Sequence, residues 1–262
     1  MTTGPDGPET VDGFLSNRIR LIQPARGHRA GLDAALLQAL IPGSAEGCLV
    51  DLGTGCGAVA MAAAARAPAL RVIGVDLDEG LLDMAGRALT LPENAEFAGR
   101  VQWIHADIGA ARPEREAAGL ADDIAEWVTM NPPFGVGGRV RPSPSERRQL
   151  AHVGTGTTLA DWVRTAAGLL KPKGRLALIH RADAVGNVLA ELDGRFGAVT
   201  IRPVHPRQRE PASRILVTAV RASGAPLKLL PALVLHRADG NWSSEVGSLL
   251  AGSDWLESDA GQ

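Results

Sequence analysis

The chain has 262 residues, enough for one large domain or two small ones with a buried core. A hydrophobic fraction of 45% and a formal net charge of −2 describe an ordinary globular protein and give no overall sign of nucleic-acid binding. The two cysteines, Cys48 and Cys56, form neither a CxxC pair nor a metal-ligand spacing, so we expect a reduced, cytoplasmic setting and no metal site. We expect no signal peptide, because the first residues have neither a basic nor an apolar region, and no membrane helix, because no apolar run reaches the ~18 residues that one needs.

Hydrophobic periodicity and turn residues predict strands that alternate with helices. We expect helices at 31–40, 58–67, 79–90, 158–170, 184–193 and 243–251, and strands at 48–53, 71–76, 100–107, 126–130, 175–180, 198–204, 214–221 and 227–236. The alternation predicts an α/β fold, with a mostly parallel twisted sheet of about seven strands and helices on both faces. The loop at 205–213 predicts an antiparallel C-terminal strand pair. We expect flexible tails at 1–14 and 253–262 around a single domain at 15–252.

A glycine-rich turn follows the first strand, in the run 51-DLGTGCGA-58. Gly53, Gly55 and Ala58 fit the dinucleotide-binding fingerprint, and Asp76 ends the next strand, where an acid that binds ribose is expected. A nicotinamide-dependent oxidoreductase is therefore one interpretation. Ordinary turn residues are another.

Asp51 favours a different cofactor for this turn. It lies two residues before the first glycine, where its carboxylate would repel a pyrophosphate at short range. S-Adenosylmethionine has no phosphate and carries an ammonium and a sulfonium, which a carboxylate attracts. Asp107 ends the third strand and is a candidate acceptor for the adenine amino group, with a capping role as the alternative. The neighbouring His105 fits a strand residue better than a catalytic base.

The stretch 130-MNPPFGVGG-138 follows the fourth strand and suits the methylation of a planar amino group. Such a nitrogen reacts only when its delocalised lone pair turns towards the methyl donor. The Asn131 side-chain oxygen and the Pro132 carbonyl could grip its two N–H bonds, while Pro132 and Pro133 fix the backbone. Phe134 offers an apolar face for a flipped-out base. Catalysis would then depend mainly on orientation and proximity, and the alternative is a proline-rich turn.

These motifs together resemble the class I S-adenosylmethionine-dependent methyltransferases that act on amino groups and carry (N/D/S)PP(Y/F/W), with a Rossmann-like fold. Phe134 replaces the commoner Tyr, and stacking survives that change. The segment 27–42 is similar to the N-terminal helix motif of the "small domain" methyltransferases. Together with the tail 233-LVLHRADGNWSSEV-246, it resembles the family that methylates adenine N6 beside the anticodon of a valine tRNA. Relatives in this group are sometimes labelled predicted O-methyltransferases. The resemblance covers residues 15–250.

The resemblance implies a cofactor half at about 27–130 and a substrate loop at about 131–157. It implies S-adenosylmethionine as cofactor, S-adenosylhomocysteine as product, and cofactor contacts at Gly31, Asp33, Asp51, Gly53, Thr54, Gly55, Gly57, Asp76, Leu77, Asp107 and Ile108. Basic segments at 18–29, 139–148 and 202–214 are either solvated loops or one basic surface patch that could hold the phosphates of RNA. The candidate RNA contacts are Arg26, Arg29, Arg139, Arg141, Arg147, Arg148 and Arg207.

Besides the nicotinamide-dependent oxidoreductase named above, four functions remain open at this point. The first is adenine-N6 methylation of RNA, tRNA above all. The second is protein glutamine-N5 methylation, which uses a similar motif but usually with a helical N-terminal domain, for which too few residues precede Gly31. The third is a small-molecule or O-methyltransferase, and the fourth a non-catalytic RNA-binding protein on the same scaffold. Intact Asn131 and Asp51 argue against the fourth.

Overall fold

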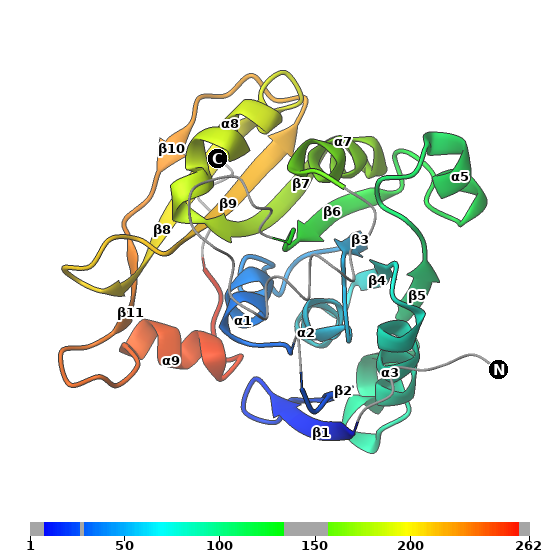
Figure 1. The fold of residues 1–262 in the computed structure, drawn as a ribbon, viewed down its shortest axis with the longest axis horizontal. Helices are drawn as coiled ribbons and strands as arrows, with labels where there is room; N and C mark the ends of the chain where they lie inside the picture. The colour runs from blue at the N-terminus through cyan, green and yellow to red at the C-terminus, as the bar shows by residue number, and fades with distance from the viewer. Residues whose placement is uncertain (1–7, 27–28, 134–156, 257–262) are drawn as a thin grey trace.

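The computed structural model describes residues 8–26, 29–133 and 157–256. Within these ranges one mixed sheet has nine strands, and a two-stranded hairpin lies apart from it (Figure 1). The sheet order is β10-β8-β9-β7-β6-β3-β4-β5, and β11 also pairs with β8. Its strands are β3 (Gly47–Leu52), β4 (Leu70–Asp76), β5 (Val101–His105), β6 (Ala125–Met130), β7 (Leu170–Arg181), β8 (Phe196–Arg207), β9 (Arg214–Arg221), β10 (Lys228–Leu229) and β11 (Leu233–His236).

Helices cover both faces of this sheet (Figure 1). One hydrophobic cluster holds side chains of α1, α2, α3 and α9, and a second cluster on the other face holds those of α7 and α8. The predicted α/β fold is therefore confirmed, including the antiparallel pairing of β8 with β9. The helical segments are α1 (Leu32–Gln38), α2 (Ala58–Arg66), α3 (Glu79–Leu89), η1 (Pro92–Asn94), α4 (Ala95–Ala98), α5 (Arg112–Ala117), α7 (Leu159–Leu169), η2 (Ala182–Ala184), α8 (Val185–Leu192) and α9 (Ser244–Leu250).

The winding of the sheet reverses between β3 and β6. Strand β3 pairs in parallel with β4 on one side and with β6 on the other. From β3 the chain moves outward through β4 to β5, then returns to β6 and continues to β7 on the opposite side. In open α/β sheets, ligands bind outside the carboxyl ends of the strands at such a switch point. We call this side of the sheet, where β3, β4, β6, β7, β8 and β11 end, the carboxyl edge.

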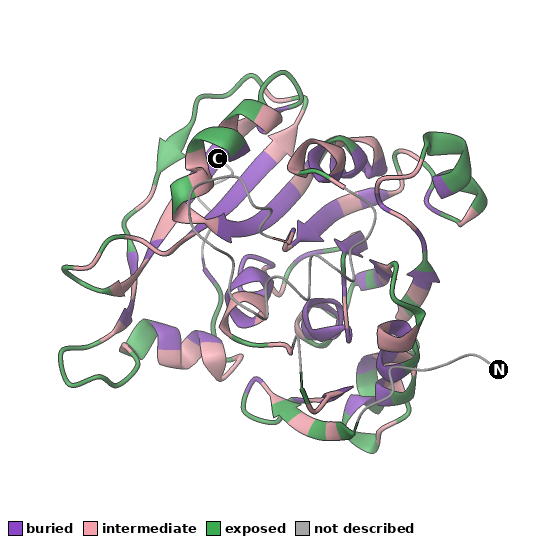
Figure 2. Cartoon of the chain, viewed as in Figure 1, coloured by how far each residue is buried: buried purple, intermediate pink, exposed green. Residues whose placement is uncertain are grey.

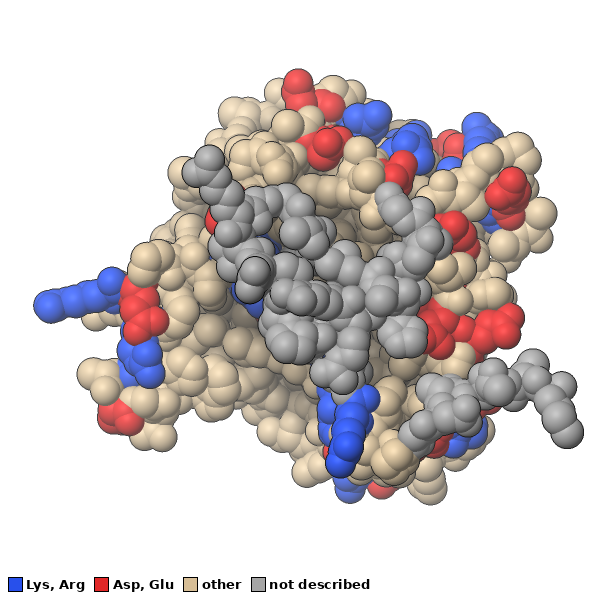
Figure 3. Space-filling model, in the orientation of Figure 1, with Lys and Arg blue, Asp and Glu red and all other residues tan. Residues whose placement is uncertain are grey.

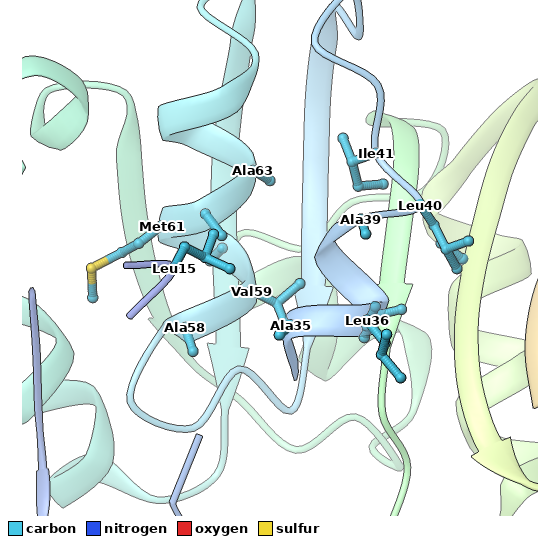
Figure 4. Close-up of a cluster of buried hydrophobic side chains, with 14 of the residues drawn as sticks. Leu15, Ala35, Leu36, Ala39, Leu40, Ile41, Ala58, Val59, Met61 and Ala63 are labelled. Carbon is cyan, nitrogen blue, oxygen red and sulfur yellow. The ribbon is translucent and has the colours of Figure 1, made fainter. Parts of the chain in front are cut away.

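Helix α2 shows how composition sets the packing near that edge. Its run of alanines favours a helix, and every residue from Ala58 to Ala64 is buried. Figure 4 shows Val59 of α2 beside Ala35 of α1, with Leu15 approaching the same cluster. Small side chains let the two helices lie close together, so a larger residue at the fully buried Ala63 would overpack the interface and cost about 1–3 kcal/mol.

The domain ends differ from the predicted boundaries. Residues Glu9–Phe14 form β1, which pairs antiparallel with β2 (Ile19–Pro24), although the sequence predicted a tail up to residue 14. Exposure alternates along ETVDGF, but Val11 lies on the exposed side and Asp12 on the half-buried side, so the hydrophobic pattern does not indicate a strand. The partner strand β2 supplies most of the buried apolar surface. At the other end, Leu256 is buried and its N–H donates to the Ala39 carbonyl, so the fold continues past residue 252.

Smaller differences concern turns and strand ends. The segment 171–174, which lies between the predicted helix at 158–170 and the predicted strand at 175–180, is an irregular part of β7, where Lys173 has a positive φ of 66° and the register to β6 shifts. The predicted run at 227–236 is split by Pro231 into β10 and β11. Figure 2 shows buried central strands, with exposed residues gathered on α5 and β10. In the described ranges no helix is long and apolar enough to cross a membrane.

Candidate active site

The turn between β3 and α2 has a backbone that requires glycine. Gly53, Gly55 and Gly57 have φ angles of 65°, 55° and 82°, in the left-handed region where other residues are strained. A Cβ atom added to Gly55 would meet no described atom within 4 Å, so space lies open over the middle of the turn. The turn can therefore form a cradle that a ligand approaches closely.

Two tryptophans support this turn and were not predicted. A Cβ atom at Gly53 would lie 2.4 Å from Cη2 of Trp162, and one at Gly57 would lie 2.5 Å from Cη2 of Trp103. Trp162 is placed in the first turns of α7 because Thr158 and Asp161 form a reciprocal capping box that starts this helix. Packing therefore excludes a side chain at Gly53 and Gly57, whereas only the backbone conformation restricts Gly55.

Asp51 lies beneath the turn with 2% of its surface exposed. Its two carboxylate oxygens accept hydrogen bonds from the Thr54 hydroxyl at 2.6 Å and from the Thr129 hydroxyl at 2.7 Å. Burial raises the pKa of Asp51 to about 6, against the lowering effect of these two hydroxyls. The carboxylate thus links the glycine turn after β3 to β6, and its charge lies under the site predicted for a cationic cofactor.

Asp76, at the end of β4, faces the same turn. Its Oδ2 accepts from the Gly55 N–H at 2.7 Å and its Oδ1 from the Asp78 N–H at 3.0 Å. Burial, opposed by these hydrogen bonds, raises its pKa above the ordinary range. The next residue, Leu77, leaves 40% of its surface exposed. An acceptor and an apolar surface are therefore adjacent, as binding of a ribose and its base would require.

The segment after β5 completes this side of the turn. Asp107 is partly buried and its Oδ1 accepts from the Gly109 N–H at 2.7 Å. Ile108 is buried, and its carbonyl accepts from the Thr165 hydroxyl at 2.8 Å, which fixes the segment against α7. His105 is the last residue of β5; it is exposed and its Nδ1 lies 3.1 Å from Glu79 on α3.

The Asn-Pro-Pro segment lies beside the glycine turn because β3 and β6 end in register. Leu52 pairs with Met130, so Gly53 and Asn131 are the first residues beyond the two paired ends. Asn131 and Pro133 are partly buried and Pro132 is buried. Among the described residues, none hydrogen-bonds the Asn131 side chain. Phe134, Arg139, Arg141, Arg147 and Arg148 lie outside the described residues.

The other predicted contacts lie around this centre. Gly31 is exposed and is the N-cap of α1, and Asp33 in the first turn of that helix forms an ion pair with Arg214 of β9 at 3.1 Å. Arg29 pairs with Asp12 of the hairpin at 2.7 Å. Arg207 pairs with Glu210, and Arg26 is exposed after β2; their role as RNA contacts stays a prediction.

Thr129 is a residue that the sequence could have revealed. It is a fully buried polar residue in an apolar strand, two positions before Asn131. Trp103 and Trp162 gave no such signal, because only the folded chain brings them to the glycines.

Cys56 is buried, which raises the pKa of its thiol to about 11, so it stays protonated and is no nucleophile. Among the described residues no group of three acidic, His or Cys side chains could hold a metal ion.

Known proteins are similar to this chain in sequence and in fold. The family model described as "Methyltransferase small domain" matches residues 29–203. The tRNA1(Val) (adenine(37)-N6)-methyltransferase of Porphyromonas gingivalis is 27% identical over 249 residues, covering 90% of this chain and 92% of that protein. The protein of the same name from Aeromonas hydrophila is 27% identical over 88% of this chain and 92% of its own. The crystal structure of a predicted O-methyltransferase from Agrobacterium tumefaciens is 32% identical, with a TM-score of 0.75, covering 87% of this chain and all of that one.

The sheet with a glycine turn and an Asn-Pro-Pro segment at its switch point defines a class I methyltransferase. A solved enzyme of this fold, the 16S rRNA N2 G1207 methyltransferase of Thermus thermophilus in complex with AdoMet and guanosine, has a TM-score of 0.53 at 20% identity, over 81% of this chain and 50% of that one. The chain belongs to the methyltransferase small domain family. The family predicted from the motifs is thereby confirmed.

Proposed function

We propose that this protein transfers a methyl group from S-adenosylmethionine to the exocyclic N6 of an adenine in tRNA. The observation that carries the proposal is the register of β3 and β6, which puts Asn131 beside the glycine turn. Its support in sequence is the similarity to tRNA1(Val) (adenine(37)-N6)-methyltransferases along most of the chain. A tRNA substrate would place the reaction in the cytoplasm.

The described residues fit S-adenosylmethionine, which supplies an activated methyl group when bound. The open space at Gly55 admits a ligand to the turn without a steric conflict. Asp76 retains lone pairs for ribose hydroxyls beside its two backbone donors. Leu77 and Ile108 would flank the adenine, and Asp107 would accept from its amino group. Gly31 and Asp33 would lie towards the methionine end, and the buried Asp51 charge would favour the cationic cofactor through space.

The Asn-Pro-Pro segment would orient the acceptor nitrogen. The Asn131 amide oxygen and the Pro132 carbonyl would each accept one N–H of the adenine amino group, so that the lone pair turns towards the methyl carbon. Neither proline has an N–H that competes for these acceptors. Phe134 would stack on the flipped-out base. The nitrogen becomes cationic as the C–N bond forms and then loses a proton readily, so orientation and proximity supply most of the rate.

Nucleoside analysis tests this proposal directly. The protein would be incubated with methyl-labelled S-adenosylmethionine and, separately, unmodified valine tRNA transcript, bulk RNA and bulk protein. We expect label in N6-methyladenosine from the transcript and loss of that label with Asn131→Ala. Label only in protein would support glutamine methylation, and label in a methylated hydroxyl would support the alternative named for the Agrobacterium relative. Binding of NAD in place of S-adenosylmethionine would refute the proposal altogether.

A further inference from the structure

A stacked pair of aromatic rings lies on the carboxyl edge, away from the cofactor turn. His236 ends β11, and Trp242 follows in the turn before α9. Their ring centroids are 4.3 Å apart with 21° between the planes, and 42% of the Trp242 surface stays exposed. We call these two rings the aromatic platform. The methyltransferase chemistry uses neither ring.

The turn that carries the platform is already held by backbone hydrogen bonds. The Arg237 N–H donates to the Asn241 carbonyl and the Ser243 N–H to the Leu235 carbonyl, both at 2.8 Å. His236 Nδ1 lies 3.1 Å from the Gly240 carbonyl oxygen, so a proton on Nδ1 donates there and sets the plane of the ring. Trp242 therefore stacks on a fixed partner with one side towards solvent, and the turn does not depend on the stack to close.

The sheet puts this platform on the substrate side of the molecule. His236 pairs in parallel with Arg207, so β8 and β11 end together at the carboxyl edge. In sheet order β7, β9 and β8 lie between β6 and β11. Four strand spacings amount to roughly 19 Å across the sheet. Ile201 of β8 is level with Met130 and Arg207 lies six residues further along β8, so the platform also lies roughly 20 Å further in the strand direction. A substrate much larger than a nucleoside could touch both places.

Positive charge flanks the platform. The side chains of Arg207 and Arg237 are each 58% exposed and pair with Glu210 at 2.8 Å and Asp239 at 3.5 Å. Figure 3 shows basic atoms over the loop between β8 and β9, at the left of the view, with acidic atoms beside them. Exposed ion pairs are weak, so either guanidinium can exchange its carboxylate for a phosphate. Bases stack on aromatic side chains while cations hold the backbone, as single-stranded RNA sites do.

We propose that His236 and Trp242 form a stacking site for an unpaired base of the RNA substrate, with Arg207 and Arg237 holding the adjacent phosphates. This inference rests on the proposed RNA methyltransferase function and adds a second anchoring point to it. It assigns Trp242 to substrate binding and not to the chemical step.

The test compares Trp242→Ala with Trp242→Phe, using valine tRNA transcript as the probe. Stacking on an aromatic side chain implies about 5- to 150-fold weaker tRNA binding for Trp242→Ala. We expect KM for tRNA to rise with kcat nearly unchanged, and Trp242→Phe to restore most of the affinity. Affinity for a fully paired RNA duplex and for S-adenosylhomocysteine should not change, which also reports on correct folding.

Trp255 offers a matched control. It is 44% exposed, and the neighbouring Asp254 carbonyl accepts from Arg66 at the end of α2, so it lies at the opposite edge of the sheet. Trp255→Ala should leave tRNA binding unchanged. Unchanged tRNA binding in Trp242→Ala, or equal losses in the Ala and Phe variants, would overturn the inference. A wild-type protein that neither binds nor methylates RNA would instead refute the proposed function.

Discussion

The carboxyl edge of this protein has two parts that are built differently. At its centre, between β3 and β6, Asp51, Thr54 and Thr129 are buried and share hydrogen bonds of 2.6 and 2.7 Å. At its flank, where β8 and β11 end, Arg207 and Trp242 are exposed. Reacting groups must be held within fractions of an ångström, whereas contacts with a large polymer tolerate movement. Substitutions at the centre should therefore cost much more than those at the flank.

The largest effect is expected for Asn131→Ala. The substitution removes the acceptor that we propose orients the amino group, and loss of one such positioned group typically lowers kcat by about 10²–10³. We expect that loss in labelled methyl transfer to tRNA. Affinity for S-adenosylhomocysteine in calorimetry should stay within about twofold of wild type. Asp76→Ala should show the reverse pattern, so an equal loss of cofactor affinity in both variants would contradict these roles.

The two glycines of the turn should separate packing from ligand binding. Gly53→Ala would bring a Cβ atom to 2.4 Å from Trp162 and strain a φ of 65°, so we expect a loss of about 2–4 kcal/mol in unfolding free energy. Gly55→Ala has similar backbone strain, but its Cβ atom would have no described neighbour within 4 Å. It should therefore lower the unfolding free energy by only about 1–2 kcal/mol and mainly weaken cofactor binding. Chemical denaturation and calorimetry on both variants measure the difference. Equal destabilisation would show that the Trp162 contact is unimportant.

These glycines also show how far sequence reasoning extends. Spacing and strand order were enough to place Gly53, Asp76 and Asn131 at one edge, because the chain itself dictates where parallel strands end. The tryptophans that pack on the turn come from β5 and α7, and nothing local marks such long-range contacts. The hairpin was missed for a similar reason, since β1 has little apolar surface of its own. The partner of Asp33 was equally invisible, as Arg214 is 181 positions away.

Thr129→Val tests the hydrogen bond that links β6 to the Asp51 carboxylate of β3. Valine keeps the shape but removes one of the two hydroxyls that bind the buried Asp51 carboxylate. Hydrogen bonds to charged groups contribute about 1.5–3 kcal/mol, so we expect that loss of stability at pH 7.5. Thr129→Ser is the control, because it keeps the hydroxyl. A smaller loss at pH 5, where more of Asp51 is protonated, would confirm that the charge is what Thr129 stabilises.

Asp51 should also make stability depend on pH. Its pKa of about 6 lies above the ordinary value of 3.8, so the folded state holds this proton more tightly than the unfolded chain. The contribution is fully present below pH 3.8 and is lost as pH rises through 6. Between pH 5 and 7.5 this single group should lower the unfolding free energy by roughly 1 kcal/mol. Asp51→Asn should flatten the profile in part, since the pKa of Asp76 is raised too. An unchanged profile would contradict the buried, partly protonated carboxylate.

The smallest effect on the fold is expected at the flank. Arg207→Gln removes an exposed ion pair with Glu210, and such pairs contribute less than about 1 kcal/mol. Unfolding free energy should therefore hardly change. If the guanidinium binds a phosphate of the RNA, the same substitution should weaken tRNA binding for every sequence alike and reduce the slope of affinity against salt by about one. Arg112→Gln, in an exposed pair on the short helix α5, is the matched control. If Arg207→Gln lowered the unfolding free energy but left the salt slope of tRNA binding unchanged, Arg207 would serve the fold and not RNA binding. The distinction between the two parts of the carboxyl edge would then fail at this residue.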